Sequence, residues 1–107
     1  MGLFHLFTRR PSLTEGLAQM ADTPHAVLLD VRTREEFEAG HLPGAKNLPL
    51  DTLLQHLPQE DSVLFSYCHS GARSAQACAM LTKQGYQAIN LGGLMGYRGP
   101  LETGKSR

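Results

Sequence analysis

The sequence predicts an α/β domain with a central, mainly parallel sheet of four to five strands flanked by helices. Short apolar runs of strand length alternate along the chain with segments whose apolar residues recur at helical spacing, a pattern typical of right-handed βαβ units. The apolar runs lack polar alternation, which indicates strands buried on both faces of the sheet. A chain of 107 residues has material for one core, so we expect residues 1–107 to form a single domain.

The first elements are a helix and a buried strand. Ser12 and Glu15 form a capping box ahead of an apolar stripe, which predicts a helix that ends at residues 22–24. Residues 26–31 are a nearly continuous apolar run and predict the first strand.

A second capping box starts the next helix. Thr33 and Glu36 have the required spacing, and Gly40 is placed to end the short helix that follows. Residues 41–45 contain Pro and Gly and predict a turn.

The middle of the chain predicts a short strand, a helix and a strong strand. Residues 46–48 are the short strand, and residues 62–67 are the strong apolar strand. Between them we expect Asp51 to cap a helix that Pro58 ends and that carries Leu53, Leu54 and Leu57.

The last third predicts a helix, a strand and a polar end. Residues 73–84 have helical periodicity and end before a Gly. Residues 88–91 are a short apolar strand, after which Gly92 and Gly93 open a final turn or helix. Residues 99–107 form a polar tail.

The overall charge argues against partners that a strongly basic protein would bind. Ten Lys and Arg residues balance ten Asp and Glu residues, so we expect no nucleic acid and no membrane as partner. No segment approaches the roughly 20 apolar residues of a membrane span. The apolar residues 3–7 are too few for a signal peptide and lack a basic start. We therefore expect a cytoplasmic protein.

The cysteines and histidines predict neither a disulfide nor a metal site. If Cys68 and Cys78 lie along one helix, about 15 Å separates them, too far for a disulfide. The Ala-rich surroundings of Cys78 favour a core residue over a resolving thiol. The five histidines show no ligand spacing; they are His5, His25, His41, His56 and His69.

The decisive feature is a cysteine between a buried strand and a Gly-containing loop that leads into a helix. Cys68 stands where ligands bind in open α/β sheets, outside the carboxyl ends of the strands. Gly71 permits a tight loop, and the amides of residues 69–74 are able to curl around the sulfur. Such an arrangement favours the thiolate, which is the nucleophile. Arg73 adds a positive charge, and this chemistry needs no metal or organic cofactor.

The other candidate residues have structural as well as functional interpretations. Arg73 either contacts substrate or steadies the loop by pairing with a carboxylate such as Glu36. Asp30 and Arg32, at a strand end, are expected to hold the sheet edge through polar contacts. Ser70 and Ser74 either donate to a bound anion or cap the following helix.

Four ordered motifs carry a family resemblance that covers about residues 27–98. The chain resembles the rhodanese family in Cys68-x-x-Gly71-x-Arg73-Ser74 after an apolar strand, in Asp30-Val31-Arg32 with Glu36-Phe37, in Gly40-His41-Leu42-Pro43-Gly44-Ala45 with Asn47, and in Asn90-Leu91-Gly92-Gly93. The motif-bearing part of the domain is thus about residues 12–98. One departure is His69, because thiosulfate-using relatives often have Arg or Lys at this position.

The resemblance implies a three-layer, rhodanese-like fold and a sulfurtransferase. Cys68 is then the catalytic residue, with Asp30, Arg32 and Glu36 in support and a substrate-binding loop of His69, Ser70, Gly71, Ala72, Arg73 and Ser74. The implied reaction is a two-step exchange in which Cys68 takes sulfur from thiosulfate, a persulfide or a polysulfide as a persulfide. A thiol or cyanide then accepts it.

Two alternative functions remain. The first is a sulfur-carrier module that relays a persulfide between partner proteins, which His69 favours because it replaces the Arg or Lys that thiosulfate-using relatives often have. The second is a phosphatase or arsenate reductase, whose related loop places five residues between Cys and Arg. Only four residues separate Cys68 from Arg73, which predicts a cradle sized for one sulfur atom.

Overall fold

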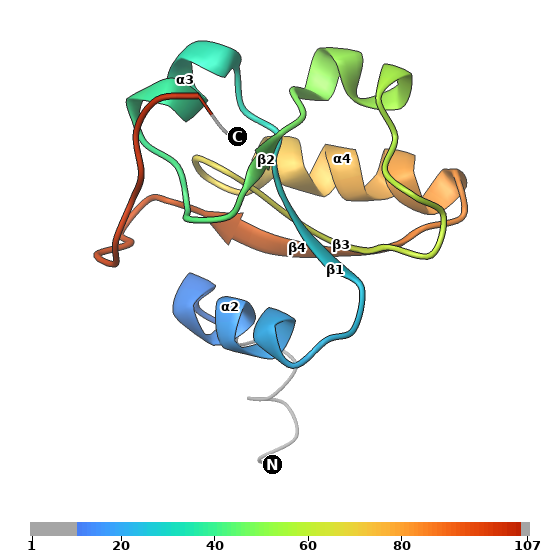
Figure 1. Cartoon of the computed structure of the whole chain (residues 1–107), viewed down its shortest axis with the longest axis horizontal. Coiled ribbons are helices and arrows are strands. Elements are labelled where there is room, and N and C mark those ends of the chain that lie inside the picture. The colour runs from blue at the N-terminus through green and yellow to red at the C-terminus, as the bar shows by residue number, and fades with distance from the viewer. Residues whose placement is uncertain (1–10, 106–107) are drawn as a thin grey trace.

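The computed structural model describes residues 11–105 and has a three-layer α/β architecture. Four parallel strands form one sheet in the order β2-β1-β3-β4. Figure 1 shows α2 on one side of this sheet and α4 on the other. The elements in chain order are α2 (Leu13–Ala21), β1 (Ala26–Asp30), α3 (Arg34–Ala39), β2 (Lys46–Asn47), the 3₁₀-helix η1 (Leu50–Gln55), β3 (Val63–Cys68), α4 (Ala72–Lys83) and β4 (Gln87–Gly93).

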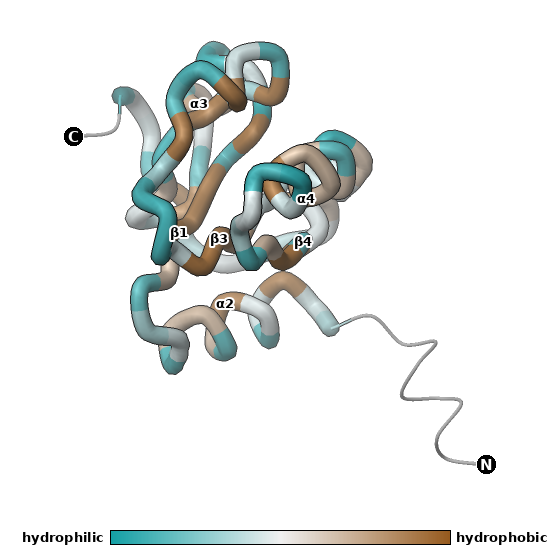
Figure 2. The backbone as a smooth tube through the Cα atoms, turned by 90° about the vertical axis from the view of Figure 1, so that its right-hand side faces the viewer, coloured by the Kyte–Doolittle hydropathy of each residue, from teal (hydrophilic) through white to brown (hydrophobic). Residues whose placement is uncertain are grey.

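The sheet separates two apolar clusters because successive side chains of a strand point to opposite faces. On one face, Leu28, Phe65 and Tyr67 pack with Leu13 of α2 and Phe37 of α3. In Figure 2 the strands contain hydrophobic stretches of the backbone tube, and they lie between α2 on one side and α3 and α4 on the other. On the other face, the strands pack against α4 and η1, and this second cluster contains Leu29, Leu64, Cys68, Leu53, Ala77 and Leu81.

The predicted helix ends are confirmed. Both capping boxes are present, at Ser12 with Glu15 and at Thr33 with Glu36. The amides of Gly85 and Tyr86 donate to Thr82 and Leu81 at 3.0 and 3.1 Å, which is the Schellman pattern at the end of α4.

The segment 50–55 differs from the prediction. It is a 3₁₀-helix preceded by Pro49, and Asp51 makes no capping hydrogen bond. With three residues per turn, side chains three apart share a face, so Leu53 is fully buried and Leu50 packs against the same cluster. The other two leucines lie outside this face, with Leu54 and Leu57 exposed to 45% and 37%.

The last strand is longer than predicted. Gly92 and Gly93 belong to β4 and pair with Tyr67 and Cys68, so they do not open the final turn. A register shift between Ser66 and Tyr67 adds one residue to β4, and Gly92 has a φ of 97° there, which glycine adopts without strain.

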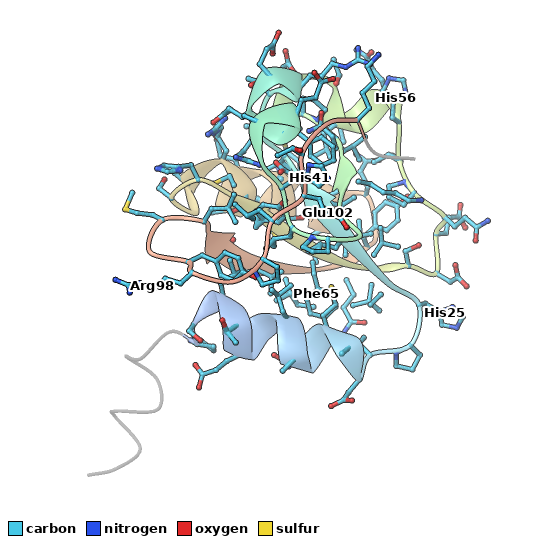
Figure 3. The ribbon with its side chains drawn as sticks, turned by 60° about the vertical axis from the view of Figure 1, so that its left-hand side comes forward. His25, His41, His56, Phe65, Arg98 and Glu102 are labelled. Atoms are coloured by element: carbon cyan, nitrogen blue, oxygen red, sulfur yellow. The ribbon has the colours of Figure 1, made fainter. Side chains whose placement is uncertain are left out.

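The segment after residue 99 is attached to the domain. His41 and Glu102 exchange two backbone hydrogen bonds of 2.8 Å, and the amide of Gly104 donates to the Glu38 carbonyl. His41 stacks on Phe37 with ring centroids 3.7 Å apart. Figure 3 shows His41 beside Glu102, whose carboxylate lies 3.8 Å from the His41 ring nitrogen. The polar composition had predicted a tail, and it gave no indication of these contacts.

The helices of residues 11–105 are short. The longest, α4, has 12 residues, and none of them is long and apolar enough to cross a membrane. The apolar residues 3–7 lie outside the described residues.

Candidate active site

Cys68 is the last residue of β3, a central strand of the sheet. Its neighbours are β1 and β4, which carry polar side chains at the same carboxyl edge. The parallel sheet therefore brings three of the predicted motifs to one edge. They are Asp30 at the end of β1 with Arg32 just after it, the loop after β3, and Asn90 on β4.

The loop after Cys68 turns back on the sulfur. Gly71 has a φ of 99°, and its amide donates to the Cys68 Sγ at 3.0 Å. Gly71 is also the residue before α4, and no side chain caps that helix. The sulfur takes the place of a side-chain cap by accepting from the first amides of the helix. Ser70 and Ser74 thus do not cap α4.

Two opposing effects act on the Cys68 thiol. Burial raises its pKa, but hydrogen bonds from the Ser74 hydroxyl and from the amides of Ser74, Gly71 and Ser70 lower it, and the pKa falls below the ordinary value of a cysteine. Donors aimed at a sulfur anion at the start of a helix favour the charged form. The loop thus favours a thiolate.

The loop presents some of its side chains to solvent and buries others. His69, Ser70 and Ala72 are exposed, whereas Gly71 and Ser74 are buried and Arg73 is half-buried. Cys68 itself is fully buried. A cavity of about 270 Å³ is lined by Val31, Leu50, Thr33, Pro49, Asp51 and Arg73. Two of these residues, Val31 and Leu50, pack in the same apolar cluster as Cys68.

Arg73 points its guanidinium at Glu36. The Nη1 and Nη2 atoms donate to the two carboxylate oxygens at 2.7 and 3.0 Å. This hydrogen-bonded pair lowers the pKa of Glu36 to about 2, chiefly through Arg73. Of the two roles weighed for Arg73, the structure shows the pairing that steadies the loop, and it leaves that charge largely neutralised.

Asp30 and Arg32 form a buried pair at the edge of the sheet. Arg32 Nη2 lies 2.6 Å from Asp30 Oδ2 and donates also to the Gly40 carbonyl at 2.6 Å. Asn47 Nδ2 donates to the carbonyls of Asp30 and Arg32. These contacts join β1, β2 and the turn after α3, as predicted. Neither side chain is hydrogen-bonded to Cys68.

Asn90 is a site residue that the sequence presented only as part of a motif. Its Oδ1 lies 2.7 Å from the Ser74 Oγ, and its Nδ2 donates to the Gly71 carbonyl at 3.2 Å. Ser74 in turn lies 3.5 Å from the Cys68 Sγ. The signal that could have revealed Asn90 is an amide at the carboxyl end of the strand next to the Cys68 strand.

Cys78 lies in the interior of α4 and is half-buried. Burial raises the pKa of its thiol, which a contact with Ser66 only partly offsets. Among residues 11–105, no three His, Cys, Asp or Glu side chains converge as a metal site would require.

Comparison with known proteins gives one family and several related structures. Residues 13–99 match the family model of the rhodanese-like domain. A sulfurtransferase of Allochromatium vinosum is 42% identical over 75% of this chain and 78% of that protein. The chain also matches tRNA uridine(34) hydroxylases, among them that of Cronobacter sakazakii, of whose length it spans 22%.

The fold is shared with solved structures. A rhodanese-like domain protein from Staphylococcus aureus superposes with a TM-score of 0.76 at 29% identity, over 86% of this chain and 94% of that one. A human single-domain sulfurtransferase superposes with a TM-score of 0.68 at 30% identity, over 83% of this chain and 96% of that one. The α/β fold predicted from the sequence is therefore confirmed.

Proposed function

The chain is a sulfurtransferase that belongs to the rhodanese-like domain family, and we propose that Cys68 is the residue that carries the transferred sulfur. The observation that supports this most directly is the Gly71 amide 3.0 Å from the Cys68 Sγ, because donors around a sulfur atom stabilise both a thiolate and a persulfide anion. His69, Ser70, Ala72, Arg73 and Ser74 complete the proposed substrate-binding loop.

In the first step, the Cys68 thiolate attacks the sulfane sulfur of thiosulfate, a persulfide or a polysulfide. A bond forms between the Cys68 Sγ and that sulfur, and the bond from the sulfane sulfur to the rest of the donor breaks. Sulfite, the donor thiolate or the polysulfide shortened by one sulfur leaves with the electron pair, and the outer sulfur of the new persulfide carries the negative charge.

In the second step, a thiolate or cyanide attacks the outer sulfur of the persulfide. The new bond to the acceptor forms as the sulfur–sulfur bond to Cys68 breaks, and Cys68 regains its thiolate. The product is an acceptor persulfide or thiocyanate. The exchange balances without a metal or organic cofactor.

The cavity beside Arg73 is the proposed route for both reactants. It lies next to the apolar cluster that contains Cys68 and is lined by residues of β1's following turn, η1 and α4. Cys68 is fully buried, so a reactant must displace the side chains at this opening or be small enough to pass. Cyanide, small thiolates and a terminal sulfane sulfur satisfy this condition.

Relay of a persulfide from a partner protein is the second candidate, and one observation favours it. Glu36 pairs with both terminal nitrogens of Arg73, so its carboxylate offsets part of the positive charge that a doubly charged thiosulfate ion would meet. The persulfide group of a partner protein carries at most one negative charge, whereas thiosulfate carries two. A phosphatase or arsenate reductase stays the less favoured alternative, because four residues, and not five, separate Cys68 from Arg73.

Intact-protein mass spectrometry tests the proposal. Incubation with polysulfide is expected to add one sulfur atom to the wild-type protein and to Cys78→Ser, and none to Cys68→Ser. An adduct that persists on folded Cys68→Ser protein contradicts the assignment. The same experiment with thiosulfate separates the two donor classes, because a relay module gains sulfur from polysulfide or a protein persulfide much faster than from thiosulfate. A cytoplasmic location and the absence of nucleic-acid and membrane partners stay predictions from the sequence.

A further inference from the structure

The Ser74 hydroxyl lies within reach of more acceptors than it can serve. Its Oγ is 2.7 Å from Asn90 Oδ1, 3.1 Å from the Gly71 carbonyl, 3.3 Å from the Gly92 carbonyl and 3.5 Å from the Cys68 Sγ. A hydroxyl has a single proton to donate. Only one acceptor receives the Ser74 proton at a time. Which acceptor receives it determines whether the Cys68 sulfur has a hydrogen bond from this hydroxyl.

Two of these four acceptors, the carbonyls of Gly71 and Gly92, compete weakly for the Ser74 proton. The Gly71 carbonyl accepts from the Ala75 amide at 3.0 Å and from Asn90 Nδ2 at 3.2 Å, which occupies both of its lone pairs. The Gly92 carbonyl lies 3.3 Å away, beyond the usual range of an O–H···O bond. The proton is thus shared between Asn90 and the sulfur of Cys68.

The contacts of Asn90 fix which end of its amide faces Ser74. The Gly92 amide donates to Oδ1 at 2.9 Å, and Nδ2 donates to the Gly71 carbonyl. A flipped amide would set its NH₂ group against the Gly92 N–H and its oxygen against the Gly71 oxygen. The network therefore assigns the oxygen to the position 2.7 Å from Ser74.

We propose that Asn90 is a positioning residue that competes with the Cys68 sulfur for the Ser74 proton. This inference rests on the proposed function, in which the sulfur alternates between neutral and charged forms. While the sulfur is a thiol, the Ser74 hydroxyl donates to Asn90. When the sulfur becomes an anion, the hydroxyl turns to it, and Asn90 Oδ1 keeps the Gly92 amide. Asn90 thus sets how strongly Ser74 stabilises the anion.

The sign of the effect separates this role from simple bracing of the loop. Asn90→Leu keeps the size of the side chain but removes the acceptor at 2.7 Å from the Ser74 Oγ. It also frees one lone pair of the Gly71 carbonyl, which lies 3.1 Å from that hydroxyl. A thiolate attracts the proton more strongly than a neutral carbonyl does, so Ser74 donates more to the sulfur anion and the pKa of Cys68 falls. A bracing residue has the opposite effect. Its loss loosens the amides around the sulfur and raises the pKa of Cys68.

The charged groups around the sulfur stay the same in this substitution. β4 has no charged residue. The groups contributed by the other elements are Arg73 on α4, Glu36 on α3, Asp30 and Arg32 at the end of β1, Asp51 on η1 and His69 in the loop. A shift caused by Asn90→Leu is therefore assigned to the hydrogen bond.

The pH dependence of alkylation by iodoacetamide measures the Cys68 thiol directly. All variants carry Cys78→Ser, so that one thiol reacts. We expect Asn90→Leu to lower the midpoint by about half a unit and Ser74→Ala to raise it by about one unit. In the Ser74→Ala background, Asn90→Leu is expected to lower the midpoint no further. An Asn90→Leu midpoint that is unchanged or raised overturns the proposal.

Asn90→Asp decides the question if Asn90→Leu does not fold. It keeps the acceptor and adds a negative charge, so the midpoint is expected to rise by about one unit, and by less when Ser74 is replaced by Ala. Equal shifts in both backgrounds overturn the proposal. Alkylation requires no sulfur transfer. Variants that shift as expected in a protein that gains no sulfur from polysulfide would therefore contradict the proposed function and leave the role of Asn90 intact.

Discussion

Cys68 lies just before α4 and Cys78 lies within it, so the two thiols meet different parts of that helix. Cys68 faces the start of the helix, where amides have no partner within the helix and donate to its sulfur. Cys78 lies in the helix interior, where the amides are already bonded. Burial raises the pKa of each thiol, yet only Cys68 ends below its ordinary value. The presence of free amide donors, and not burial, therefore explains why the pKa values of the two thiols differ.

The largest expected effect is a difference in thiol pKa between the two cysteines. Cys78→Ser leaves Cys68 as the reacting thiol, and Cys68→Ser leaves Cys78. We expect the alkylation midpoint of Cys68 to lie at least about one unit below that of Cys78, because helix-start donors stabilise the thiolate. Iodoacetamide rates measured from pH 5 to pH 10 give both midpoints. Equal midpoints for the two cysteines would contradict the claim that the amides at the start of α4 lower the pKa of Cys68.

Two glycines at the ends of α4 offer a matched pair for the next effect. Gly71 and Gly85 have φ values of 99° and 95°, so alanine at either position is expected to destabilise the fold by about 1 kcal/mol. Only Gly71→Ala also moves the amide that binds the sulfur. We expect it to lower sulfur transfer about tenfold, whereas Gly85→Ala, which has open space for a Cβ, leaves transfer near wild type.

Denaturant unfolding and a transfer assay on both glycine variants make this test. A loss of transfer that follows stability equally in Gly71→Ala and Gly85→Ala would show that the amide of Gly71 has no special part.

The smallest expected effect concerns the ion pair between Arg73 and Glu36. Folding lowers the pKa of Glu36 from 4.5 to about 2, so the pair with Arg73 contributes its full stability above pH 4.5 and loses it as the pH falls toward 2. Both side chains are 36% exposed, and solvent screening limits the contribution to about 0.5 kcal/mol. Glu36→Gln is expected to lower the free energy of unfolding by that amount at pH 7 and by nothing at pH 2.

Glu38→Gln is the matched control on the same helix. Its partner Arg34 is 71% exposed and lies 3.4 Å away, so we expect almost no change in the free energy of unfolding at either pH. Urea titrations at pH 7 and near pH 2 compare the two variants. A Glu36→Gln effect that persists near pH 2 would assign the loss to packing.

The parts of the fold that the sequence predicted depend on neighbours along the chain. The capping boxes at Ser12 and Thr33 and the glycine before α4 act over three or four residues, so their spacing is visible in the sequence. The 3₁₀ form of η1 was missed because leucines at residues 53, 54 and 57 fit an α-helical face equally well. Only packing against the second cluster selects Leu53 and leaves the others outside.

The parts of the site that the sequence did not predict depend on distant segments. Ser74 and Asn90 are 16 residues apart, and their contact depends on how α4 packs against β4. The pairing of Glu102 with His41 joins segments that no local pattern links. For Arg73 the sequence left two roles open, contact with substrate or pairing with a carboxylate such as Glu36. The tertiary structure was needed to show that Arg73 pairs with Glu36.

The backbone of Gly93 packs directly against the backbone of the loop after Cys68, because glycine has no side chain to keep them apart. A Cβ at this position would lie 2.0 Å from the His69 carbonyl oxygen, and the amides of Leu94 and Met95 donate to the carbonyls of Cys68 and His69 at 3.0 Å. The underside of the loop is thus shaped by main chain, while the side chains of His69, Ser70 and Ala72 face outward. We expect substitutions at these exposed positions to change which sulfur donors and acceptors are recognised, without disturbing the proposed nucleophile beneath them.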